Sequence, residues 1–166
     1  MDDETAIEKC RNGDQEAFRY LVEQYQKQAL SHATAILGNR EDACDAAQEA
    51  FIDAFRALKD FDNSRPFYPW FYVVLRNRCY KMAARKRETE SLDETVIVAS
   101  SAQSEDALTL ENALLSLDSE DREIITLKYF DGLSYTELAE RLQIPKGTVM
   151  SRLFHARRKL QAKLER

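Results

Sequence analysis

Residues 133–160 read LSYTELAERLQIPKGTVMSRLFHARRKL and contain two helical patterns separated by a short turn. Ser134 and Glu137 form an S-x-x-E capping box, which predicts that a helix begins at Tyr135. Pro145 suits the first position of a second helix, because its missing N–H is not needed there. The pattern predicts a helix-turn-helix, a motif that places its second helix in the major groove of duplex DNA.

The second helix of this motif combines an apolar stripe with a polar and basic face. Val149, Leu153, Ala156 and Leu160 recur at helical spacing and predict the buried side. An ordinary amphipathic hairpin with a solvated basic face is the alternative, but the cap, the turn and the basic face together favour DNA binding. The side opposite Val149, with its flanks, holds Lys146, Gly147, Thr148, Met150, Ser151, Phe154, His155 and Arg158.

Composition indicates an all-α protein. The 166 residues include only four glycines and three prolines, and the common helix formers are abundant. No apolar run approaches the length of a membrane span, so we expect no membrane insertion. The three cysteines form no C-x-x-C pair, so we expect a reduced, cytoplasmic protein that holds no metal and no cofactor.

The charge distribution reverses the first impression from the net charge. A net charge of −5, taken alone, argues against binding to DNA, which is also negatively charged. However, residues 76–87 contain six basic and no acidic side chains, and residues 146–166 contain seven basic side chains and one acidic. The segment between them is strongly acidic. Two basic segments indicate two nucleic-acid contact zones.

Periodicity predicts two small helical domains, at 5–87 and 105–166, joined by a flexible acidic linker at 88–104. Gly38 should end the first long helix and Asn39 should cap the next. Ser104 and Ser119 should cap the first two helices of the second domain. The helices expected in the first domain span 14–37, 39–58 and 67–87, and a loop occupies 59–66. For the linker, a simple tether is as good an interpretation as any specific role.

Four motifs in order and spacing resemble the extracytoplasmic-function (ECF) sigma factors, the compact specificity subunits of bacterial RNA polymerase. The resemblance implies a factor without catalytic activity that binds core polymerase at the β′ clamp helices and the β flap. It also implies recognition of −35 and −10 promoter elements, help in opening the duplex, an anti-sigma factor as regulator, and an acidic linker that mimics RNA. The motifs are Gly13-Asp14-x-x-Ala17-Phe18, Ala46 through Leu58, Phe67-x-x-Trp70-Phe71-Tyr72 running into Arg76-Asn77, and Gly132 through Arg152.

The resemblance also implies site residues. Polymerase docking falls on Asp45, Gln48, Glu49, Phe51 and Ile52. Contacts with the −10 element fall on Phe61, Asp62, Asn63, Ser64, Arg65 and Asn77, with Arg76, Lys81 and Arg85 on phosphates. Contacts with the −35 element fall on Lys146, Thr148, Met150, Ser151, Arg152, Phe154 and His155, with Arg157, Arg158 and Lys159 on phosphates. Trp70, Phe71 and Tyr72 are expected in the core.

The chain departs from the family pattern at three positions. Met150, His155 and Asp53 stand where a basic residue is common, so no consensus promoter is carried over. Two other functions are weighed. A stand-alone regulator would need a sensory or dimerising domain, but residues 5–87 instead contain a basic and aromatic helix and a strip that resembles a polymerase-docking surface. An enzyme has little support, because there is no phosphate-binding glycine loop, metal cluster or recognisable nucleophile–base motif.

Overall fold

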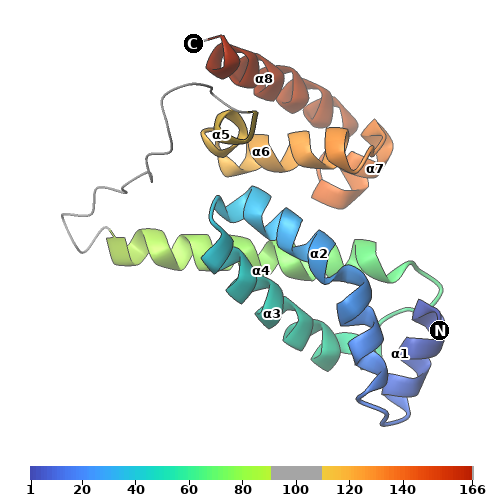
Figure 1. Cartoon of the computed structure of the whole chain (residues 1–166). Coiled ribbons are helices and arrows are strands. Elements are labelled where there is room, and N and C mark those ends of the chain that lie inside the picture. Colours follow the sequence, from blue (N-terminus) through green and yellow to red (C-terminus); the bar gives the residue numbers. More distant parts are fainter. Residues whose placement is uncertain (91–109, 166) are drawn as a thin grey trace. The chain divides into compact units, whose positions relative to one another are not determined.

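The computed structural model describes residues 1–90 and 110–165, and every regular element among them is helical, which confirms the all-α prediction (Figure 1). The chain divides into two compact units, Met1–Tyr80 and Lys81–Arg166, and the boundary falls inside the helix that spans Phe67–Glu90. The helices are α1 (Asp3–Arg11), α2 (Ala17–Leu37), α3 (Arg40–Ala57), α4 (Phe67–Glu90), α5 (Leu110–Leu115), α6 (Ser119–Ile125), α7 (Tyr135–Leu142) and α8 (Lys146–Leu164). A 3₁₀ turn (Leu58–Asp60) follows α3, and a π-helical turn (Thr126–Phe130) follows α6.

Local signals set the helix ends in the first unit. Gly38 ends α2 in the left-handed region, with φ of 79°, as predicted. Asn39 caps α3, because its side chain accepts a hydrogen bond of 2.8 Å from the backbone N–H of Asp42. The structure adds α1, which the sequence interpretation did not identify. Asp2 caps α1 by accepting from the N–H of Thr5.

Aromatic rings and alanines form the core of the first unit. The ring of Phe71 stacks on that of Phe51 with centroids 4.4 Å apart, and on that of Phe67 at 5.7 Å. Alanines 43, 46, 47, 50 and 54 are buried on α3 and let α2 lie close beside it (Figure 1). Phe71 and Tyr72 are fully buried and Trp70 is half-buried, so the expected core position of these rings is largely confirmed.

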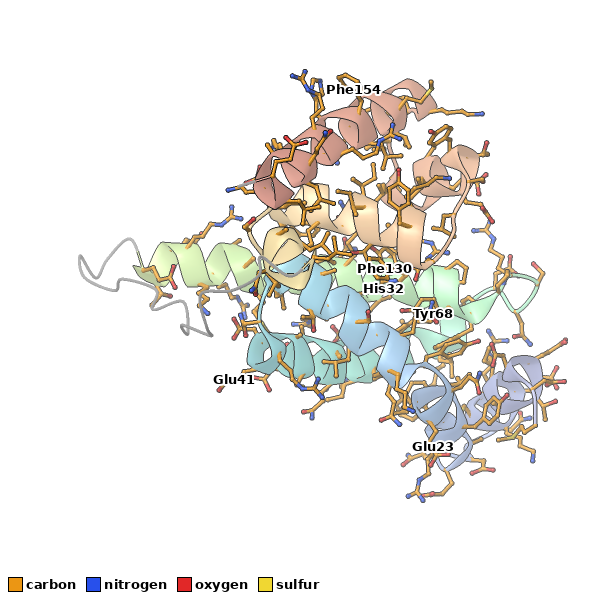
Figure 2. The ribbon with its side chains drawn as sticks, turned by 45° about the horizontal axis from the view of Figure 1, so that its top comes forward. Glu23, His32, Glu41, Tyr68, Phe130 and Phe154 are labelled. Carbon is orange, nitrogen blue, oxygen red and sulfur yellow. The ribbon has the colours of Figure 1, made fainter. Side chains whose placement is uncertain are left out.

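A buried polar pair ties α2 to α4. His32 Nδ1 and the hydroxyl oxygen of Tyr68 lie 2.6 Å apart. The rings of His32 and Tyr72 pack edge to face, with their centroids 5.1 Å apart. Figure 2 labels His32 and Tyr68 at this position. The hydrogen bond satisfies two polar groups that burial would otherwise leave without water.

The second unit is built around α8, which packs against α5, α6 and α7. Val149, Leu153 and Ala156 are buried as predicted, whereas Leu160 is half-buried. Arg122 is buried in α6, and its guanidinium donates to the carbonyls of Leu115 and Leu117. These two bonds hold the turn between α5 and α6 against the core.

Several predicted boundaries need correction. Helix α4 continues through Glu90, beyond the expected end at Arg87. Ser119 is the first residue of α6 rather than its cap, a position that Asp118 takes. Pro145 likewise precedes α8, which begins at Lys146. Ser104 and the expected linker beyond Glu90 lie outside the described residues. Across residues 1–90 and 110–165, no helix combines the length and apolar character needed to cross a bilayer.

Candidate nucleic-acid and polymerase interfaces

The helix-turn-helix is assembled by the predicted capping box and a left-handed turn. The Ser134 hydroxyl accepts from the N–H of Glu137 at 3.2 Å, and the Glu137 carboxylate accepts from the N–H of Ser134 at 2.7 Å. The bond from the Ser134 N–H to the carboxylate, aided by the Ser134 side chain, lowers the pKa of Glu137. Gln143 then turns the chain with φ of 55°, so that α7 packs on α8. The geometry is that of a helix-turn-helix.

The outer face of α8 presents the side chains expected to meet DNA. Met150 is 53% exposed and Phe154 is 51% exposed, and Figure 2 labels Phe154 on this helix. The guanidinium of Arg158 lies 5.7 Å from the centre of the Phe154 ring. Thr148 is half-buried, and its carbonyl accepts from the Ser151 hydroxyl at 3.1 Å. The exposed members of the predicted set are Lys146, Met150, Ser151, Phe154, His155, Arg157 and Arg158.

Two basic side chains of α8 are instead held by acids near the start of α6. Arg152 pairs with Glu120 at 3.5 Å. The Lys159 ammonium contacts Asp118 at 2.9 Å and Asp121 at 2.5 Å. Its hydrogen bonds raise the pKa of Lys159, and that from Lys159 to Asp118 lowers the pKa of this carboxyl. The sequence interpretation placed both cations on DNA and did not anticipate these pairs.

The loop after α3 is a compact turn organised by one carboxylate. Asp62 accepts from the N–H of Ser64 at 3.0 Å and from its hydroxyl at 2.7 Å. Arg65 also forms an ion pair with Asp62, with its Nε 3.5 Å from the carboxylate. The Ser64 hydrogen bonds, aided by Arg65, lower the pKa of Asp62. Asp62, Ser64 and Arg65 are exposed and Asn63 is half-buried, so the turn stands at the surface.

Phe61, expected among the base-contacting residues, instead lies in the core. Only 5% of its surface is exposed. Its ring lies 4.7 Å from that of Trp70 and 6.1 Å from that of Phe67, centre to centre. Burial of a large apolar ring beside two others outweighs what the loop position alone suggests. Phe61 therefore anchors the turn rather than standing at its tip.

Helix α4 carries the other predicted −10 residues. Asn77, Lys81 and Arg85 are all exposed, and their spacing of four places them along one side of the helix. The Arg76 guanidinium lies over the ring of Tyr80, 4.8 Å from its centre. An amide followed by two cations on one stripe suits a base edge followed by phosphates.

Arg78, the remaining cation of this stretch before Lys81, turns towards α3. It pairs with Glu49 at 3.0 Å and donates to Asp53. These hydrogen bonds and charges, that to Asp53 foremost, raise the pKa of Arg78. The pairing explains how Asp53 is accommodated where a basic residue is common. It also links the helix expected to hold DNA to the helix expected to meet polymerase.

The predicted docking face of α3 is largely exposed. Asp45, Gln48 and Glu49 face solvent, and Ile52 is 50% exposed. Phe51 is buried, so its predicted contact with polymerase is restricted to the floor of a groove. That groove, of about 500 Å³, is lined mostly by α2 and α3 side chains: Gln15, Glu16, Phe18, Arg19, Val22, Phe51, Ile52 and Phe55.

A second apolar groove, in the other unit, was not predicted. It measures about 360 Å³ and is lined by Leu110, Leu114, Ile125, Tyr129, Phe130, Arg157, Leu160, Gln161 and Leu164. Phe130 is 65% exposed and Tyr129 54% exposed, at the π-helical turn after α6. Two adjacent aromatics that break the helical apolar pattern were the available signal in the sequence.

The described residues offer no metal site, because no three His, Cys, Asp or Glu side chains come together there. The three cysteines, Cys10, Cys44 and Cys79, are free thiols, and Cys79 is buried.

Comparison with known proteins places both units in one class. Residues 21–89 match the family described as Sigma-70 region 2, and residues 107–160 match Sigma-70, region 4. The chain is 35% identical to the ECF RNA polymerase sigma-E factor of Escherichia coli, covering 99% of this chain and 95% of that relative.

Solved structures agree. The sigma factor RpoE of Bartonella quintana, crystallised with the anti-sigma factor NepR, is 26% identical, covers 89% of this chain and 96% of its own, and gives a TM-score of 0.71. An engineered region 2 of sigmaE in complex with GTAAAA is 36% identical, covers 54% of this chain and 95% of its own, and gives a TM-score of 0.50.

The helix-turn-helix unit and the basic, aromatic unit thus define a sigma-70-type subunit of bacterial RNA polymerase. Within that class the chain belongs to the ECF sigma factors, and it directs promoter-specific transcription initiation by RNA polymerase. Sigma factors are transcription initiation factors rather than enzymes.

Proposed function

We propose that the two units read the two halves of a promoter, the first unit the −10 element and the second the −35 element. The observation that carries the proposal is the exposed face of α8 on a complete helix-turn-helix. Support for the first unit comes from the similar region 2 of sigmaE, whose solved complex contains GTAAAA.

In the second unit, the −35 contacts are proposed to centre on Met150, Ser151 and Phe154. A hydroxyl can bond either to a base edge or to a phosphate, and apolar groups suit thymine methyls. Arg158 supplies a phosphate contact, and Arg157 supplies another only by leaving the Tyr129 hydroxyl, to which it donates. Arg152 and Lys159 join them only by leaving Glu120 or Asp118 and Asp121, so they contribute less.

The −10 contacts are proposed to fall on the turn at 62–65 of the first unit and on the exposed side of α4, a helix that continues beyond the last residue of that unit, Tyr80. The Asn77 amide can both donate to and accept from an unpaired base. Lys81 and Arg85 follow it at one-turn intervals and hold the backbone of the opened strand.

Polymerase docking is proposed to use one surface in each unit. In the first unit it is the α3 face around Gln48, Glu49 and Ile52, which receives the β′ clamp helices. In the second unit it is the groove beside Tyr129 and Phe130, which receives the β flap. Exposed aromatics in an apolar groove suit the buried centre of a protein interface. An anti-sigma factor, of the kind bound to RpoE, would act by covering these surfaces.

The remaining assignments complete the proposal. The chain acts in the cytoplasm with no catalytic activity and no cofactor of its own. Its domains span 5–87 and 105–166, with a connecting segment at 88–104.

With a net charge of −5 and two α8 cations already paired, we expect weak binding of the isolated chain to promoter duplexes at physiological salt. Tight binding without polymerase would contradict this.

The decisive test is in vitro transcription with bacterial core polymerase across a genomic promoter library. We expect a defined set of transcripts that share elements near −35 and −10. Arg158→Gln should lower their yield, whereas Lys163→Gln, which removes the same charge from an exposed position on the side of α8 near Asp118, should not. Absence of any transcript from an active core, or equal effects of the two variants, would argue against the proposed roles.

A further inference from the structure

Helix α1 contains a guanidinium that reaches the start of the turn at 62–65. Arg11 is the last residue of α1, and it donates from Nε to the carbonyl of Leu58 at 3.1 Å and from a terminal nitrogen to the carbonyl of Phe61. These carbonyls bracket the 3₁₀ turn through which the chain leaves α3. One side chain therefore closes the exit of α3 from a distant part of the sequence.

Fixing these two carbonyls fixes the base of the turn. The ring of Phe61 is held by Trp70 and Phe67, and its carbonyl is held by Arg11, so both sides of this residue are restrained. The next residue, Asp62, is the carboxylate that organises the turn through Ser64. The turn thus rises from a fixed base as a preformed unit.

Helix α1 is itself anchored well enough to transmit this restraint. Ala6 and Ile7 are fully buried, and Asp3 accepts a hydrogen bond of 2.5 Å from the Tyr25 hydroxyl of α2. The match to Sigma-70 region 2 begins at residue 21, so α1 lies before the matched residues. The restraint on the turn therefore comes from a helix outside that matched segment.

We propose that Arg11 is a positioning residue for promoter recognition: it sets the turn at 62–65 in the conformation that reads the −10 element. This rests on the proposed role of the turn in −10 recognition. Arg11 itself does not contact DNA and acts only through the turn. A planar guanidinium donates to the two carbonyls from separate nitrogens in a fixed fork, whereas a lysine ammonium has all its donors on one flexible nitrogen, so the residue type matters.

The test measures discrimination rather than total activity. A promoter selected from the library is compared with one carrying a transversion in its −10 element, in transcription by the full chain with core polymerase. We expect Arg11→Gln to reduce the ratio between the two promoters about 10-fold, as loss of two charge-assisted bonds allows, and Arg11→Lys to reduce it less. Lys9→Gln, which removes a charge from the same turn of α1, should leave the ratio unchanged.

Two further measurements separate the possible failures. Amide hydrogen exchange at Ser64 and Arg65 should be faster in Arg11→Gln while that of α2 and α3 is unchanged, and Arg11→Lys provides a milder variant if Arg11→Gln unfolds. If both promoters lose activity equally and the ratio holds, Arg11 supports only the fold and the proposal is wrong. If Asn63→Ala and Ser64→Ala also leave the ratio intact, the assignment of the turn to the −10 element fails as well.

Discussion

The two surfaces expected to read DNA are supported in different ways. The reading face of α8 belongs to a long regular helix whose opposite side is buried along its length by Val149, Leu153 and Ala156. The turn at 62–65 is held by few contacts, namely one buried ring, one guanidinium and one carboxylate. A helix distributes its support, so a single substitution on its outer face should matter little to the fold, whereas the turn should be sensitive to each of its anchors.

The largest expected difference is between the two phenylalanines of these surfaces. Phe61→Ala should destabilise the first unit by roughly 3–5 kcal/mol, as is usual for a buried ring, because it empties the space beside Trp70. Phe154→Ala should change stability by no more than about 0.5 kcal/mol, because its ring is half exposed. The chain has one tryptophan, Trp70, so urea unfolding followed by its fluorescence reports on the first unit, and far-UV circular dichroism reports on both units.

The matched control for this comparison is Leu153→Ala, which removes a buried side chain from the second unit. It should leave the Trp70 transition in place. Equal shifts for Phe61→Ala and Phe154→Ala would show that Phe61 is not the anchor that its burial indicates.

A smaller difference is expected between two doubly paired cations, one in each unit. Arg78→Met should cost about 2 kcal/mol, a typical value for charge-assisted hydrogen bonds, because Arg78 is only 21% exposed beside Asp53 and Glu49. Lys159→Met should cost about 1 kcal/mol, since the Lys159 side chain is 51% exposed and water screens its charge. Unfolding followed by Trp70 fluorescence for the first variant and by far-UV circular dichroism for the second measures both.

The pairing of Lys159 also predicts how this residue affects promoter binding. Lys159→Met should scarcely alter promoter binding by the polymerase complex if the ammonium stays with Asp118 and Asp121. A loss as large as that in Arg158→Gln would instead show that Lys159 leaves its acids to hold a phosphate.

The sequence was most informative where a local pattern determines the structure. The capping box at Ser134, the stop at Gly38 and the cap at Asn39 are each set by hydrogen bonds within a few residues, and each was predicted correctly. The helical period likewise identified the exposed face of α8.

The sequence was least informative where distant residues compete for a side chain. The burial of Phe61 depends on rings brought in by α4, and the pairing of Lys159 depends on acids 38 and 41 residues away. The reach of Arg11 to Leu58 and Phe61 is equally non-local. No period or motif records such contacts, because they arise only when the helices pack.

The smallest expected effect is the pH dependence of the capping box at the start of α7. The turn at 62–65 contains no capping box, so the effect is confined to the helix-turn-helix. Hydrogen bonding to the N–H and hydroxyl of Ser134 lowers the pKa of Glu137 in the folded chain. The stabilisation of α7 is therefore complete above the ordinary glutamate pKa of about 4.3 and is lost as the pH falls through the lowered value.

Glu137→Gln removes this titration but keeps an acceptor for the Ser134 N–H, since glutamine also serves in capping boxes. Amide hydrogen exchange at Leu138 and Leu142 should therefore accelerate in the wild-type chain below about pH 4 and change less in the variant. Asp118 also has a lowered pKa, so Asp118→Asn is the matched control: it removes an acid-sensitive pair of the same unit without touching the cap. If exchange in α7 follows Asp118→Asn rather than Glu137→Gln, the acid sensitivity belongs to the α6–α8 pair and not to the helix-turn-helix cap.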